Sequence, residues 1–207
     1  MERGLAGFLA GPGLGAAGGH PLHHGRVRLH LHPSRPPHPG RSLPMNTLRL
    51  AVVSCLFLGC SPFAPGTVGT LGGVAIAWLL RHQQPYLLWI VVCALIIYLV
   101  GRSLGTWAEA HAGKDPGIFV LDEVIGYLIT VAWTGAPSPL TLIVAFFVFR
   151  FFDIFKPPLA RRMEKIGGGD GILLDDVVSG FYGLILVMLP LRLFVDLPWS
   201  LSPGGGG

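Results

Sequence analysis

The run YLLWIVVCALIIYLV, residues 86–100, is hydrophobic throughout and has no charged residue, and a second run, GLILVMLPLRLFV, covers residues 183–195 with a single arginine. A helix that crosses the hydrocarbon core of a bilayer needs about 20 mostly apolar residues. These two runs are therefore the strongest predictions of membrane-spanning helices in the chain.

The composition of the whole chain agrees with a membrane setting. Hydrophobic residues make up 51% of the 207 residues, charged residues only 13%, and the mean hydropathy is +0.61. Soluble domains carry roughly 25% charged residues. The other apolar stretches are shorter than a full span, so we predict an all-α fold, a small polytopic membrane helical bundle of about four to six segments, some short or tilted. A very hydrophobic soluble helical domain stays open as an alternative.

The pattern predicts helical segments at 48–60, 69–81, 86–106, 118–134, 140–156 and 172–195. They belong to one domain over residues 45–200. Residues 1–44 are rich in glycine, proline and histidine, so we expect a disordered tail and a true start at Met45. Residues 201–207 are expected to be a flexible C-terminus. The three cysteines lie in apolar stretches without C-x-x-C spacing, which predicts neither a disulfide nor a zinc site.

Acidic residues inside the apolar segments are the main functional signal. Two similar phrases carry adjacent pairs, LDEVI at 121–125 and LDDVV at 174–178, and Asp153 follows a run of phenylalanines. Ionisable groups at membrane depth are costly to bury and usually mark a functional site. Paired carboxylates provide the oxygen ligands that Mg²⁺ prefers, often together with phosphate.

Helical geometry limits what each pair can do. Neighbouring residues on a helix point about 100° apart, so two adjacent acids cannot face one ligand equally. One acid of a pair can bind a metal while its neighbour binds a second metal, a water or a basic residue. Gly126 lies near Glu123 on the same face and would allow a second helix to approach closely. The alternative for Asp122 and Glu123 is a helix start whose acids complement the helix dipole.

Arg150, Asp153 and Lys156 are spaced by threes along one side of a helix that ends before Pro157 and Pro158. The two basic residues are candidates for phosphate binding, with Asp153 as a metal ligand or as the group that orients them. The alternative is an internal salt-bridge ladder, which stabilises a helix by only about 0.2–0.5 kcal/mol per pair.

Two glycine-containing stretches complete the set of candidate phosphate contacts. In APGTVGT, residues 64–70, Thr67 or Thr70 is a candidate cap for a helix whose free N–H groups would favour an anion, although an ordinary capped turn is the alternative. GGGDG, residues 167–171, is expected to be a loop that folds around an anion or a flexible joint.

Four ordered phrases resemble the phosphatidylglycerophosphatase A family of small bacterial inner-membrane proteins: APGTVGTLGG (64–73), DEVIG (122–126), FRFFDIFKP (149–157) and GGGDGILLDDVVSG (167–180). The resemblance covers nearly everything after Met45. Ser179 stands where the family tends to have alanine, and Thr70 where it tends to have serine. Neither departure removes an acid or a base.

The resemblance implies Mg²⁺-dependent hydrolysis of phosphatidylglycerophosphate to phosphatidylglycerol and phosphate, in phospholipid biosynthesis. No serine, cysteine or histidine is arranged as a nucleophile, so we expect direct attack by a metal-activated water. The expected catalytic residues are Asp122, Glu123, Asp153, Asp175 and Asp176; of these, Asp122, Glu123, Asp175 and Asp176 would bind Mg²⁺, and Arg150, Lys156, Thr67, Gly168 and Gly169 would bind the phosphate.

Two other functions fit the sequence less well. A CDP-alcohol phosphatidyltransferase places its aspartates at i, i+4 spacing after an Asp-Gly phrase, whereas the acids here are adjacent. An ion transporter would explain the repeated LD-x-V phrase, but it needs neither Arg150 with Lys156 nor the glycine stretch.

The basic residues expected in loops indicate that their connections face the cytoplasm: Lys156, Arg161, Arg162 and Lys165, with Arg102 and Lys114. The resemblance implies a bacterial inner membrane, and together with the apolar runs and the basic connections it predicts a multi-pass topology with a cytoplasmic active site. The expected partners are the lipid substrate and the membrane. Basic and aromatic residues are not interleaved, so no nucleic-acid partner is expected. The sequence leaves the oligomeric state open.

Overall fold

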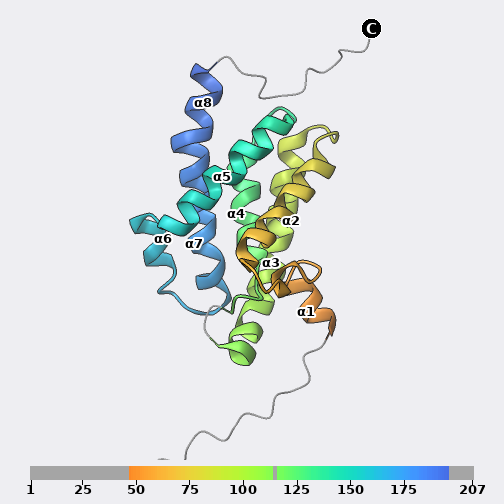
Figure 1. Ribbon diagram of the computed structural model, residues 1–207, viewed down its shortest axis with the longest axis vertical. Coiled ribbons are helices and arrows are strands. Elements are labelled where there is room, and N and C mark those ends of the chain that lie inside the picture. The colour runs from red at the N-terminus through yellow and green to blue at the C-terminus, as the bar shows by residue number, and fades with distance from the viewer. Residues whose placement is uncertain (1–46, 114–115, 196–207) are drawn as a thin grey trace, which may run out of the picture. The chain divides into compact units, whose positions relative to one another are not determined.

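The computed structural model describes residues 47–113 and 116–195, so the predictions for 1–44 and 201–207 lie outside the described residues. These residues form an all-α fold, as predicted (Figure 1). The elements in chain order are α1 (Thr47–Val53), the 3-10 turn η1 (Leu58–Cys60), α2 (Pro65–Leu80), α3 (Tyr86–Ala112), α4 (Leu121–Val131), α5 (Pro139–Phe155), α6 (Pro158–Met163), α7 (Gly168–Gly183), the π-helical turn η2 (Leu184–Met188) and α8 (Leu189–Phe194).

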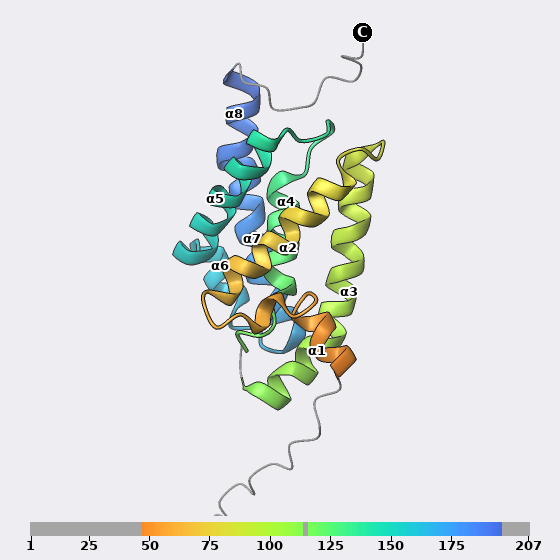
Figure 2. The same ribbon diagram turned by 45° about the vertical axis from the view of Figure 1, so that its right-hand side comes forward.

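The short helix α4 is the centre of the bundle. It contacts α2, α3, α5 and α7, which surround it in both ribbon views (Figures 1 and 2). Its side chains Val124, Tyr127 and Leu128 are fully buried and pack with Phe149 of α5 and Met188 of η2. Because α4 is enclosed by four helices, the acids in its first turn lie inside the bundle.

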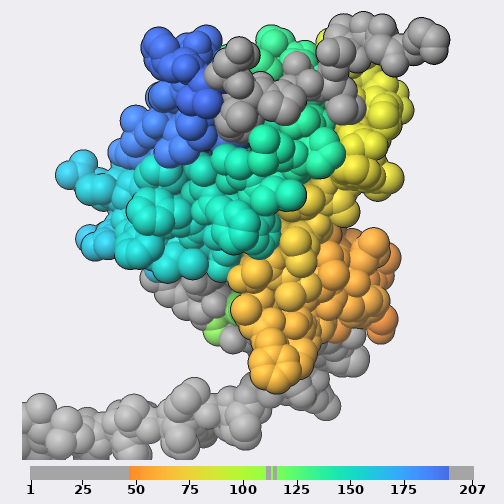
Figure 3. All heavy atoms as spheres, turned by 45° about the horizontal axis from the view of Figure 1, so that its top comes forward, coloured from red at the N-terminus to blue at the C-terminus, as the bar shows by residue number. Residues whose placement is uncertain are grey.

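Among the described residues, two helices are long and apolar enough to cross a membrane. They cover Tyr86–Ala110 and Gly168–Phe194, and the most apolar 18-residue stretch of each has a mean hydropathy of 2.3 and 2.0, respectively. In the most apolar part of the first, only 11% of the residues are buried, so most of its apolar surface faces outward. On α5, Phe147, Phe151 and Phe155 also form an exposed row, on a helix whose outer surface is visible in Figure 3. Apolar surface of this extent favours a membrane bundle over the soluble alternative.

The predicted helix 48–60 is wrong beyond Val53. Cys55, Leu56 and Phe57 have positive φ angles of 48°, 57° and 70°, so the chain turns away from the axis of α1. The turn lets the Val53 carbonyl accept a hydrogen bond from the amide of Val120 at 3.0 Å. The segment that leads into α4 is thereby fixed to the end of α1.

The prediction of a glycine loop at 167–171 is also wrong, since α7 begins at Gly168. The helix continues through η2 into α8, where Pro190 has no N–H for the carbonyl of Leu186 and the helix widens to a π turn. The six-residue helix α6 was not predicted. It begins directly after Pro157, with Pro158 at its first position.

Glycines set the distances between helices. A Cβ on Gly180 of α7 would lie 3.1 Å from the Cα of Gly126 on α4 and closer still to its carbonyl oxygen. A Cβ on Gly105 of α3 would lie 2.6 Å from the Cα of Gly169 on α7. Small residues allow this close backbone approach in membrane bundles. The expectation that Gly126 permits a close helix contact is confirmed, and its partner is the helix with the second acid pair.

Candidate functional site

A polar cavity of about 170 Å³ opens among the helices at the start of α4. Its walls come from the first turn of α2, the segment before α4, and from α4, α5 and α7. The lining residues are Pro65, Gly66, Gly117, Phe119, Asp122, Glu123, Asp153, Lys156, Asp175 and Asp176. The structure therefore brings all five predicted acids to one place, although they come from three separate helices.

Three of these acids converge closely. Asp122, Glu123 and Asp176 each offer one carboxylate oxygen, and these oxygens all lie within 4.8 Å of one another. Asp122 and Asp176 are 7% and 3% exposed. Asp122 Oδ1 and Glu123 Oε2 are buried and have no hydrogen-bond partner among the described residues. We call these three residues the acid cluster.

The acid cluster has the chemistry of a site for a hard divalent cation. Burial, followed by the negative charge of Glu123, raises the pKa of Asp122 well above its ordinary range. Buried carboxylates in such proximity repel one another unless a proton or a cation lies between them. Oxygen-only donors suit Mg²⁺, and the unpartnered oxygens of Asp122 and Glu123 are free to serve as ligands.

Asp175 does not join the acid cluster; it binds Lys156. Lys156 Nζ donates a hydrogen bond to Asp175 Oδ2 at 2.7 Å and lies 3.7 Å from Glu164 Oε2. Partial burial disfavours the ammonium, but the hydrogen bond and the charge of Asp175 outweigh it and raise the pKa of Lys156. Lys156 thus brings a permanent positive charge to the wall of the cavity. A metal-binding role for Asp175 stays a prediction.

The two acid pairs therefore differ in what their members contact. In the second pair, Asp176 belongs to the acid cluster, whereas Asp175 contacts Lys156. This difference is expected, because neighbouring residues on a helix point in different directions. In the first pair, both Asp122 and Glu123 reach the cluster. The glutamate side chain is one methylene longer, which lets its carboxylate reach back around the helix.

Arg150 pairs with Asp153, one turn further along α5. The guanidinium also lies close to Gly66 of α2, because a Cβ on Gly66 would be 3.2 Å from Arg150 Nη1 and would contact Glu123 Oε1. The predicted spacing by threes thus produces one ion pair, Arg150 with Asp153. Lys156 lies beyond the end of α5 and pairs with other elements. The salt-bridge ladder therefore does not form as a continuous row.

The first turn of α2 faces the cavity. Pro65 and Gly66 line it, and Thr67 follows as the third helical residue. The prediction that Thr67 or Thr70 caps this helix is wrong: Ala64 occupies the cap position without a side-chain hydrogen bond, and Thr70 Oγ1 donates to the Gly66 carbonyl at 2.8 Å. The amides of the first turn have no partner within an α-helix. They give this wall a partial positive charge that favours an anion.

Gly168 and Gly169 lie at the other side of α7, against α3. The amide of Gly168 donates to Glu109 Oε2 at 3.1 Å and that of Gly169 to Thr106 Oγ1 at 3.4 Å. Neither glycine lines the cavity. Since their amides are already used within the fold, the structure gives no support to their predicted contact with phosphate.

Comparison with known proteins identifies the family of the chain. Residues 51–191, about two thirds of the chain, match the phosphatidylglycerophosphatase A family. The chain belongs to this family. It is 36% identical to phosphatidylglycerophosphatase A of Haemophilus influenzae, over 60% of this chain and 77% of the relative. It is 32% identical to phosphatidylglycerophosphatase A of Escherichia coli, over 70% of this chain and 81% of the relative.

A third relative carries a different name. The chain is 37% identical, over 62% of its length and 84% of the relative, to a Bacteroides thetaiotaomicron protein provisionally named as a phosphatidylinositol-3-phosphatase. No solved structure matches the chain. All three relatives are bacterial and are named as lipid phosphatases, and this member of the phosphatidylglycerophosphatase A family is a phosphatase.

The two departures from the family pattern lie within helices. Thr70 and Ser179 are buried, and each hydroxyl donates to a carbonyl one turn earlier in its own helix. Neither side chain lines the cavity. The departures therefore leave the site of this phosphatidylglycerophosphatase A family member unchanged.

Sequence reasoning missed Gly66, Gly117, Phe119 and Glu164. Proline is favoured at the first position of a helix, so Pro65 is the signal that would have placed Gly66 in a first turn. Gly117 and Phe119 precede α4 in an irregular segment, and no sequence pattern marks them. Glu164 reaches Lys156 only because α6 folds back after the two prolines.

Proposed function

We propose that the chain hydrolyses phosphatidylglycerophosphate to phosphatidylglycerol and inorganic phosphate, as a step of phospholipid biosynthesis, and that it uses Mg²⁺. The observation that carries the proposal is the acid cluster facing Lys156 in one small cavity of a phosphatidylglycerophosphatase A family member. In the reaction, a water oxygen bonds to phosphorus, the bond to the glycerol oxygen breaks, and that oxygen takes a proton.

Asp122, Glu123 and Asp176 would hold the cation. The fit rests on the convergence of one carboxylate oxygen from each residue, and on the buried oxygens of Asp122 and Glu123 that have no hydrogen-bond partner among the described residues. A bound Mg²⁺ supplies positive charge for the phosphate oxygens and lowers the pKa of water.

The chain's own cations stabilise the transferring phosphoryl group. Lys156 lines the cavity with its ammonium fixed by Asp175, and Arg150 lies at the edge beside Gly66, fixed by Asp153. Fixed charges aimed at a site where negative charge develops lower the barrier without reorganisation during the reaction. Asp175 and Asp153 act as positioning residues in this scheme.

The proposed location is the cytoplasmic membrane of a bacterium, with α3 and the α7–α8 helix crossing it. The connection from α5 to α7 carries Lys156, Arg161, Arg162 and Lys165. Basic connections remain on the cytoplasmic side. Because Lys156 also lines the cavity, this orientation opens the site toward the cytoplasm.

Phosphatidylinositol 3-phosphate is a second candidate substrate, favoured by the name of the Bacteroides relative. The cavity of about 170 Å³ is smaller than the roughly 300–1,000 Å³ of pockets that enclose drug-sized ligands. A narrow glycerol phosphate fits such a space better than an inositol ring. We therefore rank phosphatidylglycerophosphate first.

The experiment is phosphate release by membranes containing the protein, with either lipid, with Mg²⁺ and with a chelator. Asp176→Asn should abolish release, whereas Asp170→Asn should retain most of it. Asp170 is an aspartate of the same helix, but it binds Tyr98 and Arg102 outside the cavity. Release that survives both the chelator and Asp176→Asn would refute the proposed cation site. Phosphate release from the inositol lipid alone would show that phosphatidylinositol 3-phosphate, and not phosphatidylglycerophosphate, is the substrate.

A further inference from the structure

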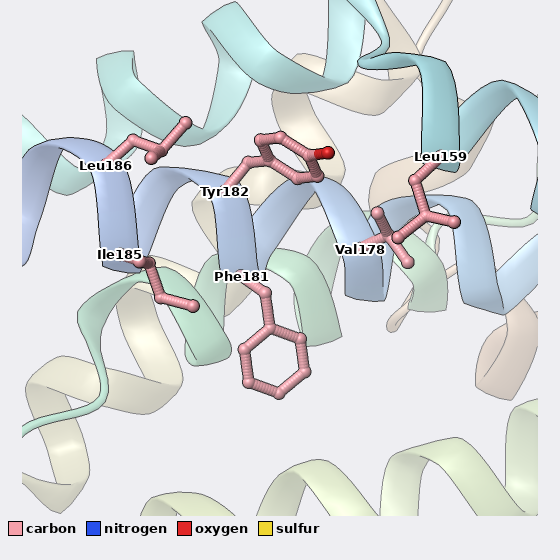
Figure 4. A pocket seen from close by; sticks show the side chains of 6 residues that line it. All are labelled: Leu159, Val178, Phe181, Tyr182, Ile185 and Leu186. Carbon is pink, nitrogen blue, oxygen red and sulfur yellow. The ribbon is translucent and has the colours of Figure 1, made fainter.

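We propose that the apolar pocket between α6 and α7 binds an acyl chain of the lipid whose phosphate occupies the polar cavity. This inference rests on the proposed function. The pocket has a volume of about 360 Å³ and is lined by Leu159, Val178, Phe181, Tyr182, Ile185 and Leu186. In Figure 4, Leu159 enters from α6 and the other side chains come from α7 and the turn that follows it.

The pocket begins one helical turn from the polar cavity on both of its walls. Val178 follows Asp175 by three residues on α7, and Leu159 follows Lys156 by three residues across the start of α6. Lys156 and Asp175 are bonded to each other at 2.7 Å. The same ion pair that lines the polar cavity therefore marks the near end of the apolar pocket.

The length of the pocket suits a chain that runs away from the head group. From Asp175 to Ile185, ten residues along a continuous helix, the rise is about 15 Å at roughly 1.5 Å per residue. The lining residues of α7 and η2 are spread over this length. A lipid with its phosphate beside Lys156 would place its acyl chain along α7.

A local distortion of the helix lies at the far end of the pocket. Ile185 and Leu186 belong to the π-helical turn caused by Pro190, and such turns are frequent at functional sites. Phe181, Ile185 and Leu186 are 47%, 54% and 56% exposed, so no other described helix fills the hollow. The pocket is thus open toward the apolar surroundings from which a lipid would enter.

An acyl chain of the substrate differs from bulk lipid because it is covalently joined to the head group. The bilayer is itself apolar, so transferring a chain into the pocket gains little hydrophobic energy. What the pocket contributes is alignment of the phosphate with Lys156 and the acid cluster. Filling the pocket should therefore reduce kcat/KM for a long-chain substrate and spare a substrate whose chains are too short to reach it.

The test compares dioleoyl and dihexanoyl phosphatidylglycerophosphate at equal mole fraction in detergent micelles. Ile185→Trp fills the pocket at a position three turns from Asp175 and outside the catalytic machinery. The matched control, Leu95→Trp, adds the same bulk to α3 at a residue of similar exposure, 55% against 54%. Leu159→Ala enlarges the near end of the pocket and gives a second variant.

Ile185→Trp should lower kcat/KM for the dioleoyl lipid about tenfold and leave the dihexanoyl lipid within about twofold of wild type. Leu159→Ala should weaken the preference for the long-chain lipid, and Leu95→Trp should change neither rate. Equal values for Ile185→Trp and Leu95→Trp on the dioleoyl lipid would overturn the proposal, as would an equal loss on both lipids. If the wild-type protein releases phosphate from neither lipid, the proposed function itself fails and this inference fails with it.

Discussion

Asp175→Asn separates the two roles that the sequence leaves open for this residue, metal ligand or anchor of Lys156. The substitution removes the negative charge but keeps the size of the side chain. At the observed 2.7 Å between Nζ and Oδ2, Coulomb's law gives an attraction of about 6 kcal/mol at an effective dielectric constant of roughly 20. Desolvation offsets part of it, since Asp175 is only 8% exposed.

Removing one partner of a buried ion pair costs about 3–5 kcal/mol. Lys156 keeps 26% of its side chain exposed, so we take the lower value of about 3 kcal/mol. If that anchoring is needed to hold the ammonium against the transferring phosphoryl group, kcat should fall about a hundredfold. Lys156→Met should cause a similar loss, and the double variant should be no worse than either single one, because residues that act as a unit are not additive.

The assay is phosphate release as a function of Mg²⁺ concentration for the two single variants and the double variant. Asp175→Asn should lower kcat with little change in half-saturation by Mg²⁺, whereas Asp176→Asn should lose the response to Mg²⁺. Lys165→Met is the matched control, because Lys165 is exposed on the same connection and lies outside the cavity. The reasoning is refuted if excess Mg²⁺ restores Asp175→Asn, or if the losses in the double variant multiply.

Three further predictions concern packing, protonation and topology. Gly180→Ala should destabilise the protein by about 1–3 kcal/mol and reduce activity, because its Cβ would displace α4 at Gly126. Gly171→Ala, on the same helix, is the control, because its Cβ would meet only ordinary contacts. If the two substitutions lowered the temperature of thermal unfolding equally, this account would be contradicted. Burial and the charge of Glu123 raise the pKa of Asp122, so protons compete with Mg²⁺ for this carboxylate more strongly than for an ordinary aspartate, and the apparent affinity for Mg²⁺ should weaken as pH falls. Calorimetry in buffers of different ionisation enthalpy should detect protons released on binding, and their absence would argue against Asp122 as a ligand. With the native Cys55, Cys60 and Cys93 replaced by serine, Lys165→Cys should react with a membrane-impermeant maleimide in inverted vesicles but not in intact cells, and the opposite pattern would place the connection outside.

The helices were largely predictable because long apolar runs are local features. The expected segment 86–106 corresponds to α3, and 140–156 to α5 within one residue at each end. The errors occur where long-range contacts override local preference. Residues 55–57 adopt positive φ as the chain turns to meet Val120, and the stretch at 167–171 is helical because Gly169 packs against α3.

The candidate site was likewise predictable in its residue types but not in its long-range contacts. The residue types identified all five acids of the cavity, because ionisable groups in apolar segments are costly to bury and usually mark a functional site. These are Asp122, Glu123, Asp153, Asp175 and Asp176. Periodicity could not show that α2 presents its first turn to these acids. Nor could it reveal the apolar pocket, which needs α6 to fold back against α7.

The sequence by itself determined the class of fold, the family and the set of acids and bases, since these follow from composition, apolar runs and ordered motifs. Only the tertiary structure decided how Asp175 and Asp176 divide their roles. On one helix they differ by about 100° in direction, and which of the two directions meets Lys156 depends on how α5, α6 and α7 pack. Which residue each acid contacts therefore depends on how the helices cross, and glycines such as Gly126 and Gly180 set these crossings. The sequence of either acid pair alone does not determine these contacts.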